Sequence, residues 1–441
     1  MTYAEATSYL ESLIDYERTP AGAAAARLWN LDRMRTMLRA LGDPHLGLRG
    51  LHLAGTKGKG STAAMAASIL TAAGYRTGLY TSPHLVSFQE RIRLDGALIP
   101  EEEVVSLVEE VRPVIEQTKT TEFGPPSFFE AYTLMAFLHF ARARVDLAVM
   151  ETGLGGRLDA TNVLSPLACG ITRLGYDHTL ELGSTLAEIA REKAGIIKPG
   201  VPVVSAPQVT EALEVLEDVC LERDAQLLVV GQETGPRVTV TAFNQQRMQL
   251  TIHGVTRFYP GLECPLVGLH QAENAAVAVG LVELLTTHGI AVPAEAVKQG
   301  LASVRWPGRF QIVRHRPTVV LDGAHDEAAA QVLADTLQTL FAGRRIFLVL
   351  SVGRDKDAAA IAAHLCPLAD RVIATASSSP RALEAPSLKE AVFRYSRHTA
   401  AYTPASLAIQ EALDQARPHD VIVVTGSLYL VGEAMRYLGV A

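Results

Sequence analysis

The sequence predicts an α/β protein in which a larger, mainly parallel sheet domain is followed by a smaller α/β domain. Three observations lead to this fold class. Short apolar runs of strand length alternate with helical stretches along most of the chain, which is typical of parallel sheets with crossover helices. A glycine-rich segment, residues 55–61, joins an apolar run to a helical stretch. A segment with Pro and Gly, residues 305–309, interrupts the alternation before it resumes.

Local signals give the elements of the first predicted domain, residues 1–302. An Ala-, Leu- and Arg-rich helix is expected over residues 23–41, where Gly42, Asp43 and Pro44 would end it. A strand at residues 50–54 precedes the glycine-rich segment, and a helix at residues 61–73 follows, with Gly74 as its stop. Further strands are expected at residues 77–80, 147–150, 168–171 and 201–205.

The end of this domain differs, and then a second domain begins. Residues 237–243 and 247–253 alternate with period two around a polar turn, which predicts an antiparallel hairpin. A long helix is expected at residues 271–287. The second domain, residues 303–441, is expected to be Rossmann-like, with strands at residues 319–321, 346–350, 372–374 and 421–424.

Composition excludes several classes of function. The chain has 441 residues, of which 48% are hydrophobic and 20% charged, with a formal net charge of −7. This is a globular composition, and its acidity argues against broad binding to nucleic acid or anionic membrane. The four cysteines form no CxxC pair, and no apolar stretch approaches membrane-helix length. We therefore expect a cytoplasmic protein, with a monomer as the default.

The glycine-rich segment is the main functional signal. It reads Gly55, Thr56, Lys57, Gly58, Lys59, Gly60, Ser61. Backbone amides at a helix N-terminus favour an anion, and Lys59 can reach terminal phosphates. The spacing departs from the standard phosphate loop, because Gly60 separates Lys59 from Ser61. The segment predicts a P-loop NTPase-like domain that binds ATP; the alternative is a glycine turn with an incidental lysine.

Further motifs follow in order along the chain. They are residues 81–85 (TSPHL), 90–92 (ERI), 151–162 (ETGLGGRLDATN), 177–179 (DHT), 191–196 (REKAGI), 270–274 with His, Gln and Asn, 306–309 (WPGR), 322–325 (DGAH) and 426–433 (GSLYLVGE). Together with the variant phosphate loop they resemble the Mur ligase superfamily, in its branch of folylpolyglutamate synthases and bifunctional dihydrofolate synthases. The resemblance covers nearly the whole chain and implies the two-domain architecture of that family.

The resemblance implies an ATP-dependent ligase. ATP would phosphorylate the carboxylate of a folate, and the amine of L-glutamate would attack the acyl phosphate. The acid would be tetrahydrofolate or dihydropteroate, and one or both activities are left open. Magnesium, expected as two ions, prefers oxygen ligands. By resemblance Glu151 and Ser82 would hold one ion, and His178 would hold the second, although histidine is an unusual magnesium ligand; otherwise His178 is a polar loop residue.

Other residues take roles from the same resemblance. Lys193 occupies a position where the family lysine is often carbamoylated, which would turn an ammonium into an anionic metal-supporting group. The alternative is an exposed helix lysine paired with an acid. Asn274 would contact the ATP base or nearby groups, or be a polar residue on a helix face. Lys59, Lys193 and His178 are the candidate catalytic residues.

The second domain is expected to close the ATP site and to hold the glutamate side. Arg309 would reach an ATP phosphate, for which a guanidinium has paired donors; the alternative is an interdomain salt bridge. Asp322 and His325 would contact the nucleotide. The chain departs from the family pattern at Asp326 and Glu327, which stand where Asn and Pro are usual. An acceptor-only carboxylate there puts any contact that needs an NH₂ donor in question.

The folate side carries weaker signals. By resemblance the pterin side would include residues from two segments, namely Ser127, Phe128, Phe129 and Glu130 from one and Leu158 and Asp159 from the other. An aromatic pair suits a flat pterin, although the two phenylalanines can equally begin a buried helix.

Two rival functions remain. A ligase for another acid, such as a cell-wall precursor, is disfavoured by the motif at residues 81–85 and by the early position of the phosphate loop. A P-loop ATPase switch or motor would hydrolyse ATP without an amine acceptor. Dependence of ADP release on L-glutamate and a folate acid separates these classes.

Overall fold

The computed structural model describes residues 1–15 and 30–440. Part of the predicted helix at residues 23–41 lies outside the described residues. Its described part is α3 (Leu31–Ala40), which begins where the side chain of Asn30 accepts the N–H of Asp32. Such a cap satisfies one of the open donors at a helix start.

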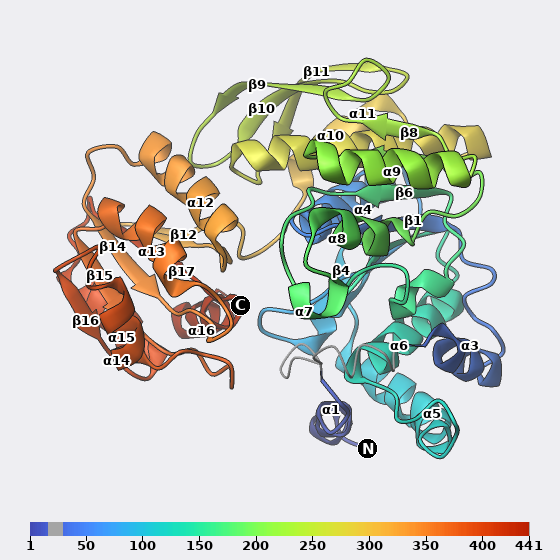
Figure 1. Ribbon diagram of the computed structural model, residues 1–441, viewed down its shortest axis with the longest axis horizontal. Helices are drawn as coiled ribbons and strands as arrows, with labels where there is room; N and C mark the ends of the chain where they lie inside the picture. Colours follow the sequence, from blue (N-terminus) through green and yellow to red (C-terminus); the bar gives the residue numbers. More distant parts are fainter. Residues whose placement is uncertain (16–29, 441) are drawn as a thin grey trace. The chain divides into compact units, whose positions relative to one another are not determined.

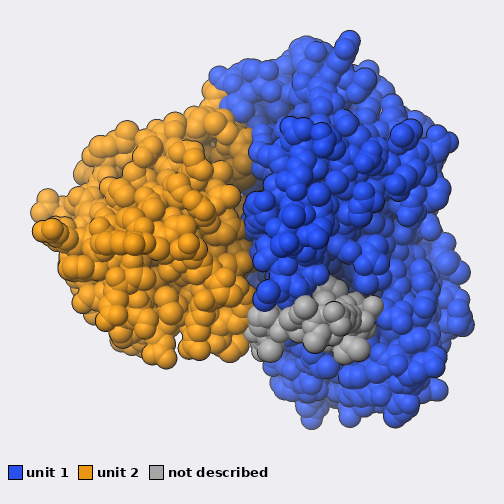
Figure 2. All heavy atoms as spheres, viewed as in Figure 1, with its two compact units in different colours: residues 1–241, 249–264, 271–304 blue, residues 242–248, 265–270, 305–441 orange. Residues whose placement is uncertain are grey.

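The chain divides into two compact units (Figure 2). Unit 1 consists of residues 1–241, 249–264 and 271–304, and unit 2 of residues 242–248, 265–270 and 305–441. Two short segments from the middle of the chain thus belong with its last part. Within the described residues no helix is long and apolar enough to cross a membrane. None of the four cysteines forms a disulfide, and all four are buried.

Unit 1 contains an eight-stranded sheet in the order β4-β3-β2-β5-β1-β6-β7-β8. Its strands are β1 (Gly50–Ala54), β2 (Thr77–Tyr80), β3 (Ile92–Leu94), β4 (Ala97–Leu98), β5 (Leu147–Glu151), β6 (Ala168–Ile171), β7 (Val203–Ser205) and β8 (Leu227–Val229). The strands from β2 to β8 in this order run parallel, and β3 and β4 add antiparallel pairs at one end. The prediction of a mainly parallel sheet is confirmed.

Helices cover both faces of this sheet (Figure 1). One apolar cluster joins Met150 of β5 to α1 (Tyr3–Glu11), α3, α5 (Glu101–Thr118) and α6 (Phe128–Ala143). A second cluster joins Cys169 of β6 to α8 (Leu186–Ala194) and α9 (Thr210–Glu222). Met150 and Cys169 are both register partners of His52, so both clusters lie on one face. The opposite face meets α10 (Leu269–Leu284), whose Leu281 lies beside Gly170.

A small sheet is formed by β9 (Arg237–Phe243), β10 (Met248–His253) and β11 (Phe258–Cys264), in the order β11-β10-β9. The N–H of Asn244 donates to the carbonyl of Arg247 at 3.0 Å and closes the turn between the first two strands. The expected hairpin is therefore present, and β11 extends it. The helix α11 (Ala294–Ser303) packs against α4 (Lys59–Ala72) and against β11.

Unit 2 contains a six-stranded sheet in the order β12-β13-β17-β14-β15-β16. The strands are β12 (Gln311–His315), β13 (Thr318–Leu321), β14 (Ile346–Leu350), β15 (Arg371–Ala374), β16 (Thr399–Ala401) and β17 (Val421–Thr425). All neighbours are parallel except β12 and β13. The helices are α12 (Glu327–Leu340), α13 (Ala358–Leu365), α14 (Ala385–Val392), α15 (Ala405–Gln415) and α16 (Leu428–Leu438). This is the expected second α/β domain.

Candidate active site

The predicted site residues of unit 1 converge at one edge of its sheet. The strands β2, β5, β1 and β6 are consecutive neighbours and run parallel. Their carboxyl ends therefore share an edge, where open α/β sheets bind ligands. β1 leads into the phosphate loop, β2 into the loop of Ser82, β5 ends at Glu151, and the loop after β6 carries His178.

The phosphate loop has the local geometry that an anion requires. Gly58 is the N-cap of α4, with φ of 90° and no side-chain cap. The first bond of the helix runs from the N–H of Thr62 to the carbonyl of Gly58 at 2.9 Å. The amides of Lys59, Gly60 and Ser61 precede it, and the first amides of a helix have no partner within the helix. The uncapped end of α4 can therefore receive phosphate oxygens.

The first half of the loop is held by the segment after β6. The N–H groups of Thr56 and Lys57 both donate to the carbonyl of Arg173 at 3.1 Å. The hydroxyl of Thr56 donates to the carbonyl of Gly175 at 3.1 Å. A Cβ at Gly55 would collide with the side chain of Thr172. Because these contacts engage the amides of Thr56 and Lys57, the amides from Gly58 onward are the candidates for phosphate binding.

Asn274 braces the loop from α10. Its side chain is 6% exposed and donates to Oε1 of Gln271 at 2.9 Å. A Cβ at Gly58 would collide with Oδ1 of Asn274, so only glycine lets the loop approach the helix this closely. Gln271 in turn donates to the hydroxyl of Ser61 at 3.4 Å. Asn274 is thus buried against the phosphate loop, and its contact with the ATP base stays a prediction.

Lys193 lies beneath the loop on α8. The residue is 4% exposed, and Nζ donates to the carbonyl of Gly55 at 2.9 Å. Burial, followed by the nearby positive charge of Lys59, lowers the pKa of Lys193 to about 7. The alternative of an exposed helix lysine is therefore wrong. A lysine with this pKa carries a large neutral fraction near pH 7.

Glu151 offers a buried carboxylate at the same edge. It is 4% exposed, and its Oε2 accepts the N–H of Ser82 at 3.2 Å. The loop after β2 is thereby attached to the end of β5. The donor set of carboxylate and hydroxyl oxygens fits magnesium, which takes few protein ligands and completes its octahedron with water and phosphate.

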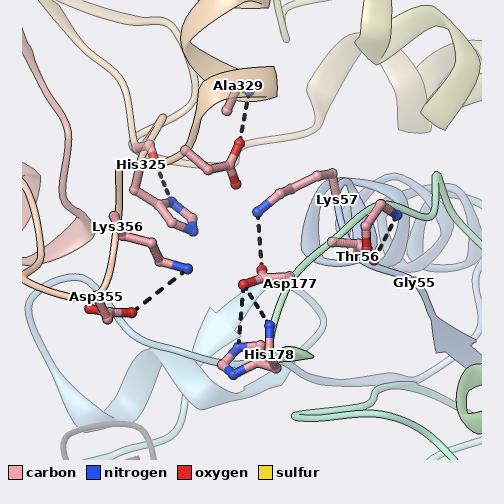
Figure 3. Close-up of polar contacts among 12 residues, drawn as sticks. Gly55, Thr56, Lys57, Asp177, His178, His325, Ala329, Asp355 and Lys356 are labelled. Carbon is pink, nitrogen blue, oxygen red and sulfur yellow. Dashed lines mark hydrogen bonds and ion pairs between the residues drawn. The ribbon is translucent and has the colours of Figure 1, made fainter. Parts of the chain in front are cut away.

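A charged pair lies beside the loop (Figure 3). Nζ of Lys57 and Oδ2 of Asp177 are 3.2 Å apart, with side chains 30% and 14% exposed. The backbone N–H of His178 donates to Oδ1 of Asp177 at 3.1 Å, and the histidine side chain is 42% exposed. The pair joins the phosphate loop to the segment of His178. A magnesium ion at His178 stays a prediction.

The predicted pterin segment begins α6. Ser127 is its N-cap, and Ser127 and Glu130 form a reciprocal capping box. Oε1 of Glu130 also accepts from Nε of Arg33 at 2.7 Å. Phe128 is 2% exposed and belongs to the core. Phe129 is only partly buried and packs against Gly153. All four residues thus have structural contacts, since Phe129 also lies with its ring 6.0 Å from that of Tyr80, and a pterin contact of this segment stays a prediction.

Both carboxylate oxygens of Asp159 accept hydrogen bonds from its own loop. The neighbouring Leu158 is partly buried. One carboxylate oxygen of Asp159 accepts the N–H groups of Gly153 and Leu154 at 2.9 and 3.0 Å. The other accepts the N–H and hydroxyl of Thr161. Burial raises the pKa of Asp159. These bonds close the turn that follows Glu151, and a folate contact of Leu158 or Asp159 stays a prediction.

Unit 2 brings its three predicted residues together around Gly323. The carboxylate of Asp322 accepts the N–H of Phe310 at 2.7 Å and the N–H of Ala324 at 2.8 Å. Burial raises the pKa of Asp322, and the charge of Arg309 opposes this shift. A Cβ at Gly323 would collide with the guanidinium of Arg309. The contact between Nδ1 of His325 and the carbonyl of Gly323, 2.8 Å, requires the proton on Nδ1 (Figure 3).

The departure at Asp326 has a local explanation. Asp326 is the N-cap of α12, and its Oδ1 accepts the N–H of Ala329 at 2.9 Å. Asp and Asn are about equally good N-caps, because each offers a side-chain oxygen. The acceptor role is therefore preserved, and the added negative charge is favourable at a helix N-terminus.

Two participants were not assigned from the sequence. Gln271 contacts both Asn274 and Ser61. Its position three residues before Asn274 on a predicted helix could have indicated that the two side chains are neighbours. Asp177 pairs with Lys57 over a separation of 120 residues. No local pattern reveals a pair at that distance, although Asp177 is part of a motif quoted above.

Models of two domain families match this chain. The Mur ligase middle domain matches residues 53–282, and the Mur ligase, glutamate ligase domain matches residues 308–428. The dihydrofolate synthase/folylpolyglutamate synthase of Bacillus subtilis (strain 168) is 37% identical over 414 residues, which cover 92% of this chain and 94% of that protein.

Solved structures have the same fold. Mycobacterium tuberculosis folylpolyglutamate synthase complexed with ADP matches with a TM-score of 0.88 and 34% identity, covering 99% of this chain and 98% of that one. An FPGS–AMPPCP–folate complex matches with a TM-score of 0.84 and 30% identity, covering 99% and 100%. The chain therefore belongs to the Mur ligase family, in its branch of folylpolyglutamate and dihydrofolate synthases.

Proposed function

We propose that this protein is an ATP-dependent ligase that joins L-glutamate to tetrahydrofolate and its glutamylated forms. One observation carries the proposal: the uncapped end of α4, the carboxylate of Glu151 and the loop of Ser82 meet at the carboxyl edge of one parallel sheet. This arrangement suits a polyphosphate with its counter-ion. The known relatives named as folylpolyglutamate synthases support the choice of acid.

The reaction proceeds in two steps. A carboxylate oxygen of the folate attacks the γ-phosphorus of ATP, and ADP leaves. The amine of L-glutamate then attacks the acyl carbon, phosphate leaves, and the amine proton goes to solvent. The amides from Gly58 onward and Lys59 would hold the phosphates and offset the charge that moves onto the β-phosphate. Magnesium, when bound at Glu151 and Ser82, supplies further positive charge to the phosphate oxygens.

The remaining roles rest on the same proposal. Unit 1 would hold ATP and the folate, and unit 2 would supply Arg309, Asp322 and His325 to the nucleotide and take the glutamate. His178 would hold a second magnesium ion. Lys193 would be carbamoylated, which its burial and lowered pKa favour, because only the neutral amine adds CO₂. We further propose a cytoplasmic monomer.

Addition of L-glutamate to dihydropteroate is the second candidate activity. The name of the Bacillus subtilis relative includes dihydrofolate synthase, which favours it. Both reactions use the same activation of a carboxylate, so the candidates differ only in the acid that is accepted.

ADP release measured with each substrate omitted in turn tests the proposal. Release should require both L-glutamate and either tetrahydrofolate or dihydropteroate, and competition between the two acids ranks them. ADP release that is indifferent to glutamate and to both acids would falsify the ligase assignment. Release with glutamate and an acid unrelated to folates would indicate another member of the same family.

A further inference from the structure

The loop that contains Ser82 is hydrogen-bonded to two neighbouring side chains, those of Glu90 and Arg91. The loop after β2 runs through residues 81–87 into the short helix η1 (Phe88–Arg91). Glu90 in this helix points back at the loop. Its Oε1 accepts the N–H groups of Val86 and Ser87 at 2.7 and 2.8 Å, and its Oε2 accepts the N–H of Leu85 at 2.9 Å. The carboxylate of Glu90 thus accepts hydrogen bonds from three successive backbone amides.

Arg91 supports the same loop from beneath. It is 1% exposed, and its Nε donates to Nδ1 of His84 at 2.9 Å. Arginine can only donate, so Nδ1 is the acceptor and the neutral ring of His84 carries its proton on Nε2. The carbonyl of Arg91 accepts the N–H of Thr81 at 3.0 Å. The loop is therefore bound to Arg91 on both sides of Ser82.

The guanidinium of Arg91 also packs on α6. Its central carbon lies 5.0 Å from the ring centre of Phe128 and 5.5 Å from that of Tyr132. Cation–π contacts of this kind are strongest when the cation is desolvated. Phe88 extends the cluster, with its ring 4.6 Å from that of His84. Arg91 therefore connects the loop of Ser82 to the helix whose start is the predicted pterin segment.

We propose that Glu90 and Arg91 are positioning residues that fix the loop of Ser82 for metal binding, an inference that rests on the proposed function. In this role both side chains act on the loop through hydrogen bonds rather than as metal ligands or substrate contacts. Their effect passes through the backbone of residues 81–87 to Ser82, whose N–H already meets Oε2 of Glu151 at 3.2 Å. Groups that hold metal ligands in place typically change metal affinity or activity 10- to 100-fold when they are replaced.

Two conservative variants test the inference. Glu90→Gln keeps one oxygen acceptor but turns an NH₂ group toward one of the three amides. Arg91→Lys keeps the charge but loses the planar group that bonds His84 and packs on the rings. His84→Asn is a variant that should retain the network, because the amide oxygen of Asn can still accept the hydrogen bond from Arg91. Glu102→Gln and Arg76→Lys are matched controls at exposed positions of unit 1.

The primary measurement is binding of Mn²⁺ in place of Mg²⁺ to the protein with ADP, followed by electron paramagnetic resonance of free Mn²⁺. The dissociation constant for Mn²⁺ is expected to be at least about tenfold higher in Glu90→Gln and in Arg91→Lys. Values near the wild type are expected for His84→Asn and both controls. Hydrogen exchange should show faster exchange at Leu85, Val86 and Ser87 in Glu90→Gln, while the thermal midpoint identifies any global unfolding.

The possible failures are distinguishable. If wild-type protein releases ADP without glutamate or folate, the proposed function is wrong and the inference falls with it. If wild-type turnover is as proposed but folded Glu90→Gln and Arg91→Lys bind Mn²⁺ with wild-type affinity, the positioning role is refuted. Weaker Mn²⁺ binding in the controls as well would also refute it, because the effect would not be specific to the network.

Discussion

The buried amine of Lys193 gives the sharpest prediction. An exposed lysine with a pKa near 10.5 has roughly one neutral amine in three thousand at pH 7. The pKa of about 7 for Lys193 makes about half of the amines neutral at the same pH. The neutral fraction should be about one tenth at pH 6 and about nine tenths at pH 8. At a fixed pressure of CO₂, carbamoylation of Lys193 should therefore rise steeply between pH 6 and pH 8.

The assay is ¹³C NMR of the protein under ¹³CO₂, at a fixed CO₂ pressure and at pH 6, 7 and 8. A carbamate signal should appear in the wild type and vanish in Lys193→Arg, whose guanidinium keeps the charge but forms no carbamate. Lys298→Arg, at an exposed position, should keep the signal. Absence of a signal in the wild type across this range, or its survival in Lys193→Arg, would refute the reasoning.

The same lowered pKa predicts how stability depends on pH. In the unfolded chain Lys193 keeps its proton up to about pH 10.5, and in the folded protein only up to about pH 7. The unfolded state therefore binds more protons between these values, so stability from this group rises with pH through that window. Below about pH 7 the amine is charged in both states, so the cost of burying that charge reduces stability in full. In Lys193→Met, chemical denaturation should show a shallower rise of stability from pH 7 to pH 10 than in the wild type; an unchanged slope would contradict the pKa.

Three further predictions concern single side chains. Lys59→Ala should abolish most ADP release at an unchanged thermal midpoint, and near-normal turnover would remove Lys59 from the phosphate site. In a double-mutant cycle, Lys57→Met and Asp177→Asn should be coupled by roughly 1 kcal/mol or less in stability, because the pair is partly exposed; zero coupling would show that the 3.2 Å pair contributes nothing. Ser127→Ala should cost about 1 kcal/mol of stability through the lost cap with little change in the KM for folate, whereas a large rise in KM without destabilisation would make Ser127 a ligand contact.

The sheet was predictable wherever a strand is a continuous apolar run. β1 and α4 were expected at residues 50–54 and 61–73, and they occur at Gly50–Ala54 and Lys59–Ala72. The helix begins earlier because Gly58, with φ of 90°, serves as its N-cap. β11 was missed because Pro260 and Gly261 lie inside it, and these residues usually signal a turn. It lies at the edge of its sheet, where proline is tolerated.

The sequence allowed us to predict those site residues that lie at strand ends or in recognisable motifs. Parallel strands place Glu151, Ser82 and the phosphate loop at one edge once the sheet is expected. The burial of Lys193 and the occupied oxygens of Asp159 were not predictable. Both depend on which loop folds over which helix, and period and composition carry no information about that.

The two short segments of unit 2 restrict how this chain can be divided. Phe243 and Val267 pack into the apolar core of unit 2, although they precede Arg305 by about sixty and forty residues. The side chain of Gln245 donates to the carbonyl of Leu340 at 3.4 Å. A fragment cut at residue 305 would leave part of its own interior behind. A single recombination event therefore cannot transfer unit 2 intact to another protein, and a designed swap must carry all three segments together.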